Sequence, residues 1–203
     1  RLVAGRQSVS REIEETANLL ASICRPGVET VVVKSNHDDA LDRWLDSDDG
    51  MKDEENVRLW LHLNARHVDA IHRRERFDPF RAAIELSGEL EGAVWPARFS
   101  SYEVDYPAGP IELNLHGDRG NAGARGSPMG FVRAAPKVIS AHSHTPYRRE
   151  GHGSVGTSTL MDMAYNRGLS AWAHAHVVVY PSGHWTHVFM KGGRYRPGET
   201  THV

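Results

Sequence analysis

The sequence lacks the features that mark disulfide-stabilised and membrane-spanning proteins. Its 203 residues contain one cysteine, Cys24, which excludes an internal disulfide framework and fits a reducing compartment. No apolar run approaches the roughly 20 residues that span a bilayer, so we expect no membrane partner. The formal charge of −2 also lacks the basic excess typical of non-specific nucleic-acid binding. Local arginines and bound metal ions can still offset that charge.

The composition, 39% hydrophobic and 25% charged, predicts a globular protein, which we expect to be a single domain over residues 1–203. The predicted helices span about 8–24, 40–45, 52–74 and 79–86, and the predicted strands span 28–34, 99–104, 110–115, 137–141, 153–157, 174–180 and 185–190. A helix followed by an apolar strand indicates an α/β fold built in layers. The segment 47–92 is expected to form a helical insertion.

Histidine is unusually abundant, with thirteen residues, and three predicted strands end in it or beside it. The stretch "VETVVVKSNHDD" ends in Asn36 and its neighbours, "IELNLHGDRG" contains His116, and "KVISAHSHTP" contains His142 and His144. Ligands of open α/β sheets bind at the carboxyl ends of strands, and imidazole and amide oxygens are plausible ligands for divalent ions. Each segment alone is more typical of a turn. The three together predict a shared metal-binding edge.

Two further polar residues follow Asn36. An aspartate beside a histidine can raise the basicity of the imidazole and hold its orientation, so His37 and Asp38 are a candidate proton-transfer pair. The other His-x-His pair, His174 and His176, opens an apolar run instead of ending one, and we expect it to be structural. The remaining histidines are expected to be solvated or structural.

The loop "GDRGNAGARGSP", residues 117–128, directly follows His116. Its glycines let backbone amides approach an anion. Arg119 and Arg125 could form paired hydrogen bonds to phosphate oxygens, and Asn121 lies between them. We predict that this loop contacts a substrate phosphate, with a flexible surface loop as the alternative. It is not a P-loop, because the Gly-Lys-Ser/Thr ending is missing.

The order Asn-His-Asp, strand-terminal His and His-x-His resembles the C-terminal three motifs of the calcineurin-like metallophosphoesterases, with Ser35 and Ala141 where that family has glycine. The stretches "HGDRGNAGARGSP", "AHSHTPYRREGHGSVGTSTLMDMAYNRGLSAW" and "HVVVYPSGHWTHVFM" look like a phage branch of the family, which includes the early DNA-transfer proteins of some tailed phages. The resemblance implies a layered α/β metallophosphoesterase-like sandwich.

The resemblance also implies roles for the motif residues. Asn36, His116 and His142 would bind one of two divalent metal ions, and His144 would bind the other. His37 would be the proton donor or the transition-state stabiliser near the leaving oxygen, with Asp38 orienting it. Mn²⁺ is the expected metal, with Fe, Zn and Mg as alternatives.

Two upstream motifs of that family, Asp-x-His and Gly-Asp, have no counterpart here, because the helix that should follow them begins near Ser8. The chain also starts at Arg1 without a methionine, which suggests a fragment or a processed product. We therefore expect a fold truncated at its N-terminus. The chain by itself should be a poor or inactive catalyst unless a partner supplies the missing ligands.

The leading hypothesis is a metal-dependent phosphoesterase, specifically a phosphodiesterase or nuclease that acts on DNA through a dinuclear metal centre. The phosphate chemistry comes from the histidine and asparagine set, whereas the DNA substrate comes only from the phage resemblance. A phosphomonoesterase or nucleotidase, a non-catalytic DNA-binding or assembly module, and a mononuclear zinc hydrolase are the alternatives. The expected location is the cytoplasm, with a phage-infected host cell as one setting, and the oligomeric state stays open.

Overall fold

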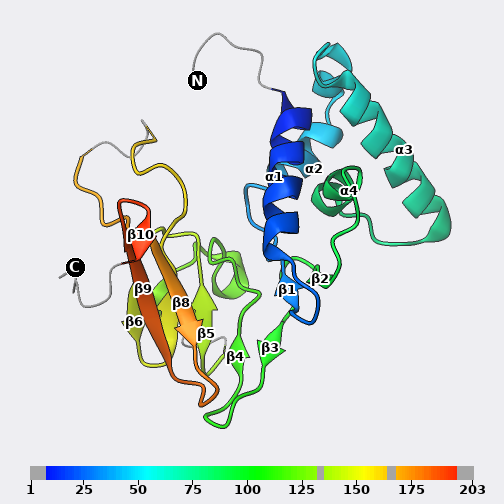
Figure 1. The fold of residues 1–203 in the computed structure, drawn as a ribbon. Coiled ribbons are helices and arrows are strands. Elements are labelled where there is room, and N and C mark those ends of the chain that lie inside the picture. Colours follow the sequence, from blue (N-terminus) through cyan, green and yellow to red (C-terminus); the bar gives the residue numbers. More distant parts are fainter. Residues whose placement is uncertain (1–7, 132–134, 164–167, 196–203) are drawn as a thin grey trace. The chain divides into compact units, whose positions relative to one another are not determined.

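The computed structural model describes residues 8–131, 135–163 and 168–195, which form a mixed α/β protein (Figure 1). These residues divide into two compact units. Unit 1 contains residues 8–32 and 36–95, and unit 2 contains residues 33–35 and the described residues from 96 onward. The segment 47–92 lies wholly within unit 1. A single domain with this segment as an insertion stays a prediction.

Unit 1 is mainly helical. Its helices are α1 (Val9–Ile23), α2 (Asp39–Leu45), the 3-10 helix η1 (Asp48–Lys52), α3 (Val57–Arg73) and α4 (Pro79–Glu85). Its core is the apolar cluster of Leu45, Leu59, Leu63, Ala82 and Ala83. Among the described helices, none is both long and apolar enough to cross a membrane.

Local capping explains where two of these helices begin. The Ser8 hydroxyl accepts a hydrogen bond from the backbone N–H of Arg11 at 3.3 Å, which starts α1. The Asp78 carboxylate accepts one from the N–H of Arg81 at 3.0 Å, and Pro79 is the first residue of α4. The sequence predicted both of these helix starts, and both are confirmed.

The predicted helix over 52–74 begins five residues late, at Val57. The Asp53 carboxylate accepts hydrogen bonds from the backbone N–H groups of Glu55 and Asn56, at 3.1 and 3.3 Å. An aspartate that bonds to nearby backbone groups offers them an alternative to helix, so this turn delays the start of α3. Residues 48–52, just before this turn, form the 3-10 helix η1.

Unit 1 also contains one short parallel strand pair, β1 (Thr30–Val31) with β2 (Ala93–Val94). The strand predicted over 28–34 is therefore much shorter than expected. The N–H of Val28 bonds back to the Arg25 carbonyl at 3.0 Å across the Pro-Gly turn, which takes the first residues out of the strand. The partner strand β2 was not predicted.

Unit 2 contains two sheets. The strands of the five-stranded sheet are β3 (Glu103–Val104), β4 (Ile111–Glu112), β5 (Val138–Ser140), β6 (Tyr147–Arg149) and β7 (His152–Ser154), in the order β3-β4-β5-β7-β6. The strands of the other sheet are β8 (Ala175–Val179), β9 (Trp185–Lys191) and β10 (Arg194–Tyr195), all antiparallel, in the order β10-β9-β8. Short helices η2 (Asn121–Gly123) and α5 (Pro128–Phe131) lie between β4 and β5 in the sequence.

The core of unit 2 joins its two sheets. Ile111 and Ile139 of the five-stranded sheet cluster with Trp185 of the three-stranded sheet. Gly153 lies under the Trp185 ring, where an added Cβ would come within 2.3 Å of it. Within the five-stranded sheet β4, β5 and β7 are parallel neighbours. Their carboxyl ends therefore share one edge of that sheet, where the sequence predicts ligand-binding residues.

Candidate functional site

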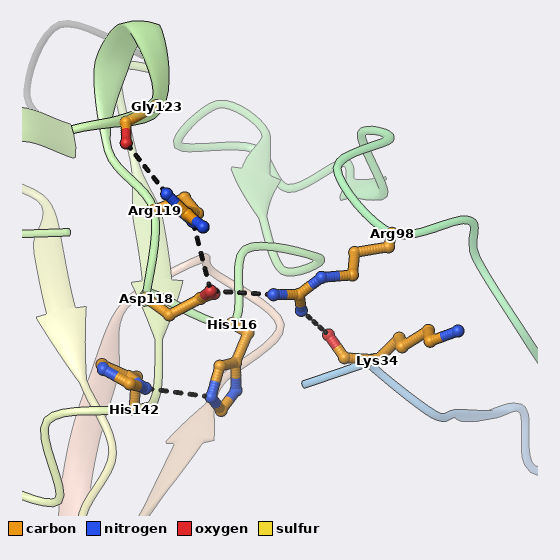
Figure 2. A network of polar contacts seen from close by, with 7 residues as sticks. All are labelled: Lys34, Arg98, His116, Asp118, Arg119, Gly123 and His142. Carbon is orange, nitrogen blue, oxygen red and sulfur yellow. Dashed lines mark hydrogen bonds and ion pairs between the residues drawn. The ribbon is translucent and has the colours of Figure 1, made fainter. Parts of the chain in front are cut away.

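The structure brings His116 and His142 together. His116 follows β4 and His142 follows β5, and the two strands are parallel neighbours. His116 Nε2 lies 3.3 Å from His142 Nδ1, with ring centroids 5.2 Å apart and planes at 76° (Figure 2). The N–H of Ala141 donates to the His116 carbonyl at 2.8 Å, so backbone as well as side chains links the two segments.

This spacing suits two ligands of one metal ion. Nitrogen ligands about 2.0–2.1 Å from a tetrahedral ion lie about 3.3 Å from each other, which matches the 3.3 Å between the His116 and His142 nitrogens. Two imidazoles are also borderline ligands of the kind that Mn, Fe and Zn accept. Among the residues that the structure describes, no group of three or more His, Cys, Asp or Glu side chains could hold a metal ion. The pair therefore fits part of a ligand set.

The turn that carries His142 and His144 has an unusual backbone. Both residues have positive φ, 64° and 58°, a region that side chains other than glycine rarely adopt. The N–H of Ser143 donates to the Ala141 carbonyl at 2.7 Å. Strained residues persist when their surroundings hold them, and they cluster at functional sites. The ring of His144 packs edge-on against Trp172, with centroids 4.2 Å apart, and its assignment to a metal stays a prediction.

A buried hydroxyl group on the neighbouring strand β7 holds the turn that carries His142 and His144. The Ser154 hydroxyl, fully buried in β7, lies 3.2 Å from the Ala141 carbonyl and 3.1 Å from the Ser143 hydroxyl. On neighbouring β6, burial raises the pKa of the Tyr147 phenol, and the Ser140 hydroxyl acts in the opposite direction. The phenol therefore keeps its proton at neutral pH and is a poor candidate for a base.

An ion pair fixes the segment after His116. Arg98 Nη2 lies 2.8 Å from Asp118 Oδ2, and the two side chains are only 12% and 11% exposed. The other end of the Arg98 guanidinium, Nη1, donates to the Lys34 carbonyl at 3.0 Å. Figure 2 shows the guanidinium between these two acceptors. One side chain thus joins the chain just after His116 to Lys34, the last residue of the first predicted strand.

A buried polar network holds the loop that carries Arg98. Asn114, 4% exposed, donates through its side-chain amide to the carbonyls of Ala97 and Ser100 at 3.0 and 2.7 Å. The Glu112 carboxylate, 5% exposed, accepts hydrogen bonds from the Ser101 hydroxyl and from the N–H of Asn114. None of Arg98, Glu112 and Asn114 was predicted from the sequence as a site residue. The signal for two of them was Glu and Asn at alternate positions of the apolar stretch "IELNLH".

The 117–128 loop packs closely around its glycines. An added Cβ on Gly126 would lie 1.8 Å from the Gly117 carbonyl oxygen, and one on Gly117 would lie 3.0 Å from the Ala141 carbonyl oxygen. Gly117 also has a φ of +110°, a conformation that only glycine adopts easily. The loop therefore lies directly against the chain at His116 and His142.

The three predicted phosphate contacts lie on this loop. Arg119 pairs with Arg125 in an isolated β-bridge, and the Arg119 guanidinium donates to the Gly123 carbonyl at 3.3 Å. Asn121 donates through its amide to the Gly130 carbonyl at 3.0 Å. All three residues are exposed. Two cations thus project into solvent from a loop anchored beside the histidine pair, although their contact with a substrate stays a prediction.

Asn36, His37 and Asp38 belong to unit 1 and form the turn that leads into α2. The N–H of Ala40 donates to the His37 carbonyl, and the N–H of Leu41 donates to the Asp38 carbonyl, at 2.9 and 3.0 Å. The His37 side chain is exposed, and those of Asn36 and Asp38 are half-buried. Their predicted metal-binding and proton-transfer roles stay predictions.

Other histidines have structural partners. His152 is 3% exposed, and its two ring nitrogens lie 3.0 Å from the carbonyls of Glu150 and Ala135. His174 Nε2 lies 2.7 Å from the Thr159 carbonyl. These contacts leave the His116–His142 pair as the candidate site in unit 2.

No family model matches the chain, and no solved structure matches it. The chain is similar to Protein A1 of Escherichia phage T5, with 33% identity over 194 residues. The match covers 95% of this chain and 34% of Protein A1, so the chain spans about a third of the length of this curated relative. The chain therefore has a phage homologue, as the resemblance to phage sequences predicted.

Proposed function

We propose that the chain is part of a metal-dependent phosphoesterase, a phosphodiesterase or nuclease that acts on DNA. The observation that carries the proposal is the His116–His142 nitrogen pair, 3.3 Å apart at the carboxyl ends of two parallel strands. Two further observations support the proposal. The arginine-bearing loop packs against this pair, and the chain is similar to a phage protein. The proposal extends to the fold, a layered metallophosphoesterase-like sandwich. The proposed setting is the cytoplasm of a phage-infected cell.

In the proposed mechanism, His116 and His142, together with Asn36, would hold one divalent ion, and His144 would hold a second. When bound, such ions lower the pKa of a coordinated water and withdraw charge from phosphoryl oxygens. Arg119, Arg125 and Asn121 would orient the phosphate through hydrogen bonds to its non-bridging oxygens. His37, oriented by Asp38, would give its proton to the leaving alkoxide.

The proposed site needs further carboxylate ligands. We expect them in a segment of the intact protein outside residues 1–203 or in a partner, because the Asp-x-His and Gly-Asp motifs have no counterpart here. The isolated chain should then bind metal weakly and turn over slowly. Activity should therefore be measured on the intact protein and not on the isolated chain.

The direct test measures Mn²⁺-dependent hydrolysis by the intact protein on three substrates: single-stranded DNA, duplex DNA and an aryl phosphate monoester. We expect cleavage of DNA that exceeds hydrolysis of the monoester, and loss of both when EDTA removes the metal. Faster hydrolysis of the monoester would favour a phosphomonoesterase or nucleotidase. DNA binding without hydrolysis would favour the non-catalytic module, and no metal-dependent hydrolysis of any phosphate ester would contradict the proposal.

A further inference from the structure

Phe99 combines two features that are unfavourable for a phenylalanine. Its φ is +64°, and 64% of its surface is exposed. A positive φ is uncommon for residues other than glycine, and in a bulky residue it marks a turn, strain or a functional constraint. Single exposed apolar residues are ordinary. A strained and exposed aromatic residue beside a candidate site is not ordinary. It indicates that the ring contacts a bound molecule.

Hydrogen bonds hold the backbone on either side of Phe99. The Asn114 side-chain amide bonds to the carbonyls of Ala97 and Ser100, which flank the Arg98–Phe99 pair. The Glu112 carboxylate accepts a hydrogen bond from the N–H of Tyr102 at 3.2 Å. Because Glu112 and Asn114 are buried, this loop is held from the sheet side. The backbone that carries the ring is therefore held in place and is not part of a loose loop.

Arg98 backs the Phe99 ring and links it to the site. The guanidinium carbon lies 4.5 Å from the ring centroid, and the same guanidinium bonds Asp118 at 2.8 Å. With guanidinium C–N bonds of about 1.33 Å, the ring lies within roughly 9 Å of the Asp118 carboxylate. Asp118 is two residues from His116. The ring thus lies beside the loop that carries the candidate phosphate contacts.

We infer that Phe99 is a stacking platform for a nucleobase of a single-stranded nucleic acid bound along the His116–His142 edge. The inference rests on the proposed function and narrows it, because a small phosphate monoester has no base to stack. Aromatic side chains bind bases of any sequence through the π-face that every base has. Because hydrogen bonds hold the backbone on both sides of Phe99 and Arg98 packs on its ring, little conformational entropy is lost when a base stacks on it.

The test uses three variants of the intact protein. Phe99→Asn removes the ring but tolerates the left-handed backbone, Phe99→Tyr keeps the ring, and Tyr195→Ala removes another exposed aromatic of unit 2, 57% exposed, as the matched control. Affinity for a short fluorescein-labelled oligo(dT) is measured by anisotropy in EDTA, so that no cleavage occurs. We expect Phe99→Asn to bind about tenfold or more weakly. Phe99→Tyr and Tyr195→Ala should bind as the wild type does.

Two further readouts separate stacking from a structural role. The melting temperature of Phe99→Asn should equal or exceed that of the wild type, because asparagine relieves the backbone strain. A fully abasic oligonucleotide should bind wild type and Phe99→Asn equally. Unchanged oligo(dT) affinity in Phe99→Asn, or a loss that Phe99→Tyr also shows, would overturn the inference. Mn²⁺-dependent hydrolysis of an aryl phosphodiester reports on the proposed function separately, since that substrate has no base.

Discussion

Replacing His142 with alanine should lower Mn²⁺-dependent DNA hydrolysis by the intact protein by about a hundredfold or more, and His116→Ala should do the same. Each change removes one of two nitrogens that lie 3.3 Å apart. The remaining imidazole cannot hold an ion as tightly. The comparison is made from initial rates over a Mn²⁺ titration, in which both variants should also need more metal to reach half of their maximal rate.

The matched control for these variants is His176→Ala. His176 is an exposed histidine on β8 of the same unit. Its loss should leave the rate within about twofold of wild type, because exposed positions far from special contacts tolerate substitution. Near-wild-type rates for His116→Ala and His142→Ala, or an equal loss in His176→Ala, would remove the metal-ligand assignment.

Replacing Arg98 with methionine should cost the protein about 3–5 kcal/mol of unfolding free energy, because it leaves a nearly buried carboxylate without its closest cation. Asp118 is 11% exposed and bonds Arg98 at 2.8 Å. The Lys34 carbonyl would also lose its donor. The loss of unfolding free energy is measured by urea unfolding, monitored by circular dichroism. If the two units unfold in separate transitions, the loss of unfolding free energy should appear in the transition of unit 2, which contains Arg98 and Asp118.

A second variant separates the buried charge from general packing. In Arg98→Met/Asp118→Met both members of the ion pair are replaced, so no lone charge stays buried, and the protein should be more stable than Arg98→Met alone. Arg119→Met serves as the control because that side chain is 61% exposed and lies 4.0 Å from Asp118. Its effect should stay within about 0.5 kcal/mol. A loss below about 1 kcal/mol in Arg98→Met would contradict the proposed role of the ion pair.

Local sequence signals accounted for the helix starts and for the location of the histidine pair. Ser8 and the Asp78-Pro79 pair act on backbone groups within a few residues, so their effect is visible in a single stretch. His116 and His142 both follow apolar strands, and adjacent parallel strands carry them to the same edge. The two strands that precede these histidines, β4 and β5, are shorter than predicted, since apolar patterning does not show where pairing ends.

The features that the sequence analysis missed depend on non-local contacts. Strand β2 pairs with β1 across about sixty residues of sequence, and only two residues of each take part. Arg98 meets Asp118 and the Lys34 carbonyl, which lie 20 and 64 residues away. Such contacts leave no periodic signal in the chain. Polar residues within an apolar stretch, as at Glu112 and Asn114, are the sequence feature that could have indicated an anchored loop.

The measurement that tests the metal assignment most directly is a Mn²⁺ titration of the intact protein followed by NMR of the histidine ring protons. Bound Mn²⁺ broadens the signals of nearby nuclei, and His116→Ala and His142→Ala identify the two signals of interest. We expect these two signals to broaden first, at metal concentrations that leave the signal of exposed His176 unchanged. Broadening that spares His116 and His142, or that reaches all exposed histidines together, would contradict the assignment of this pair as metal ligands.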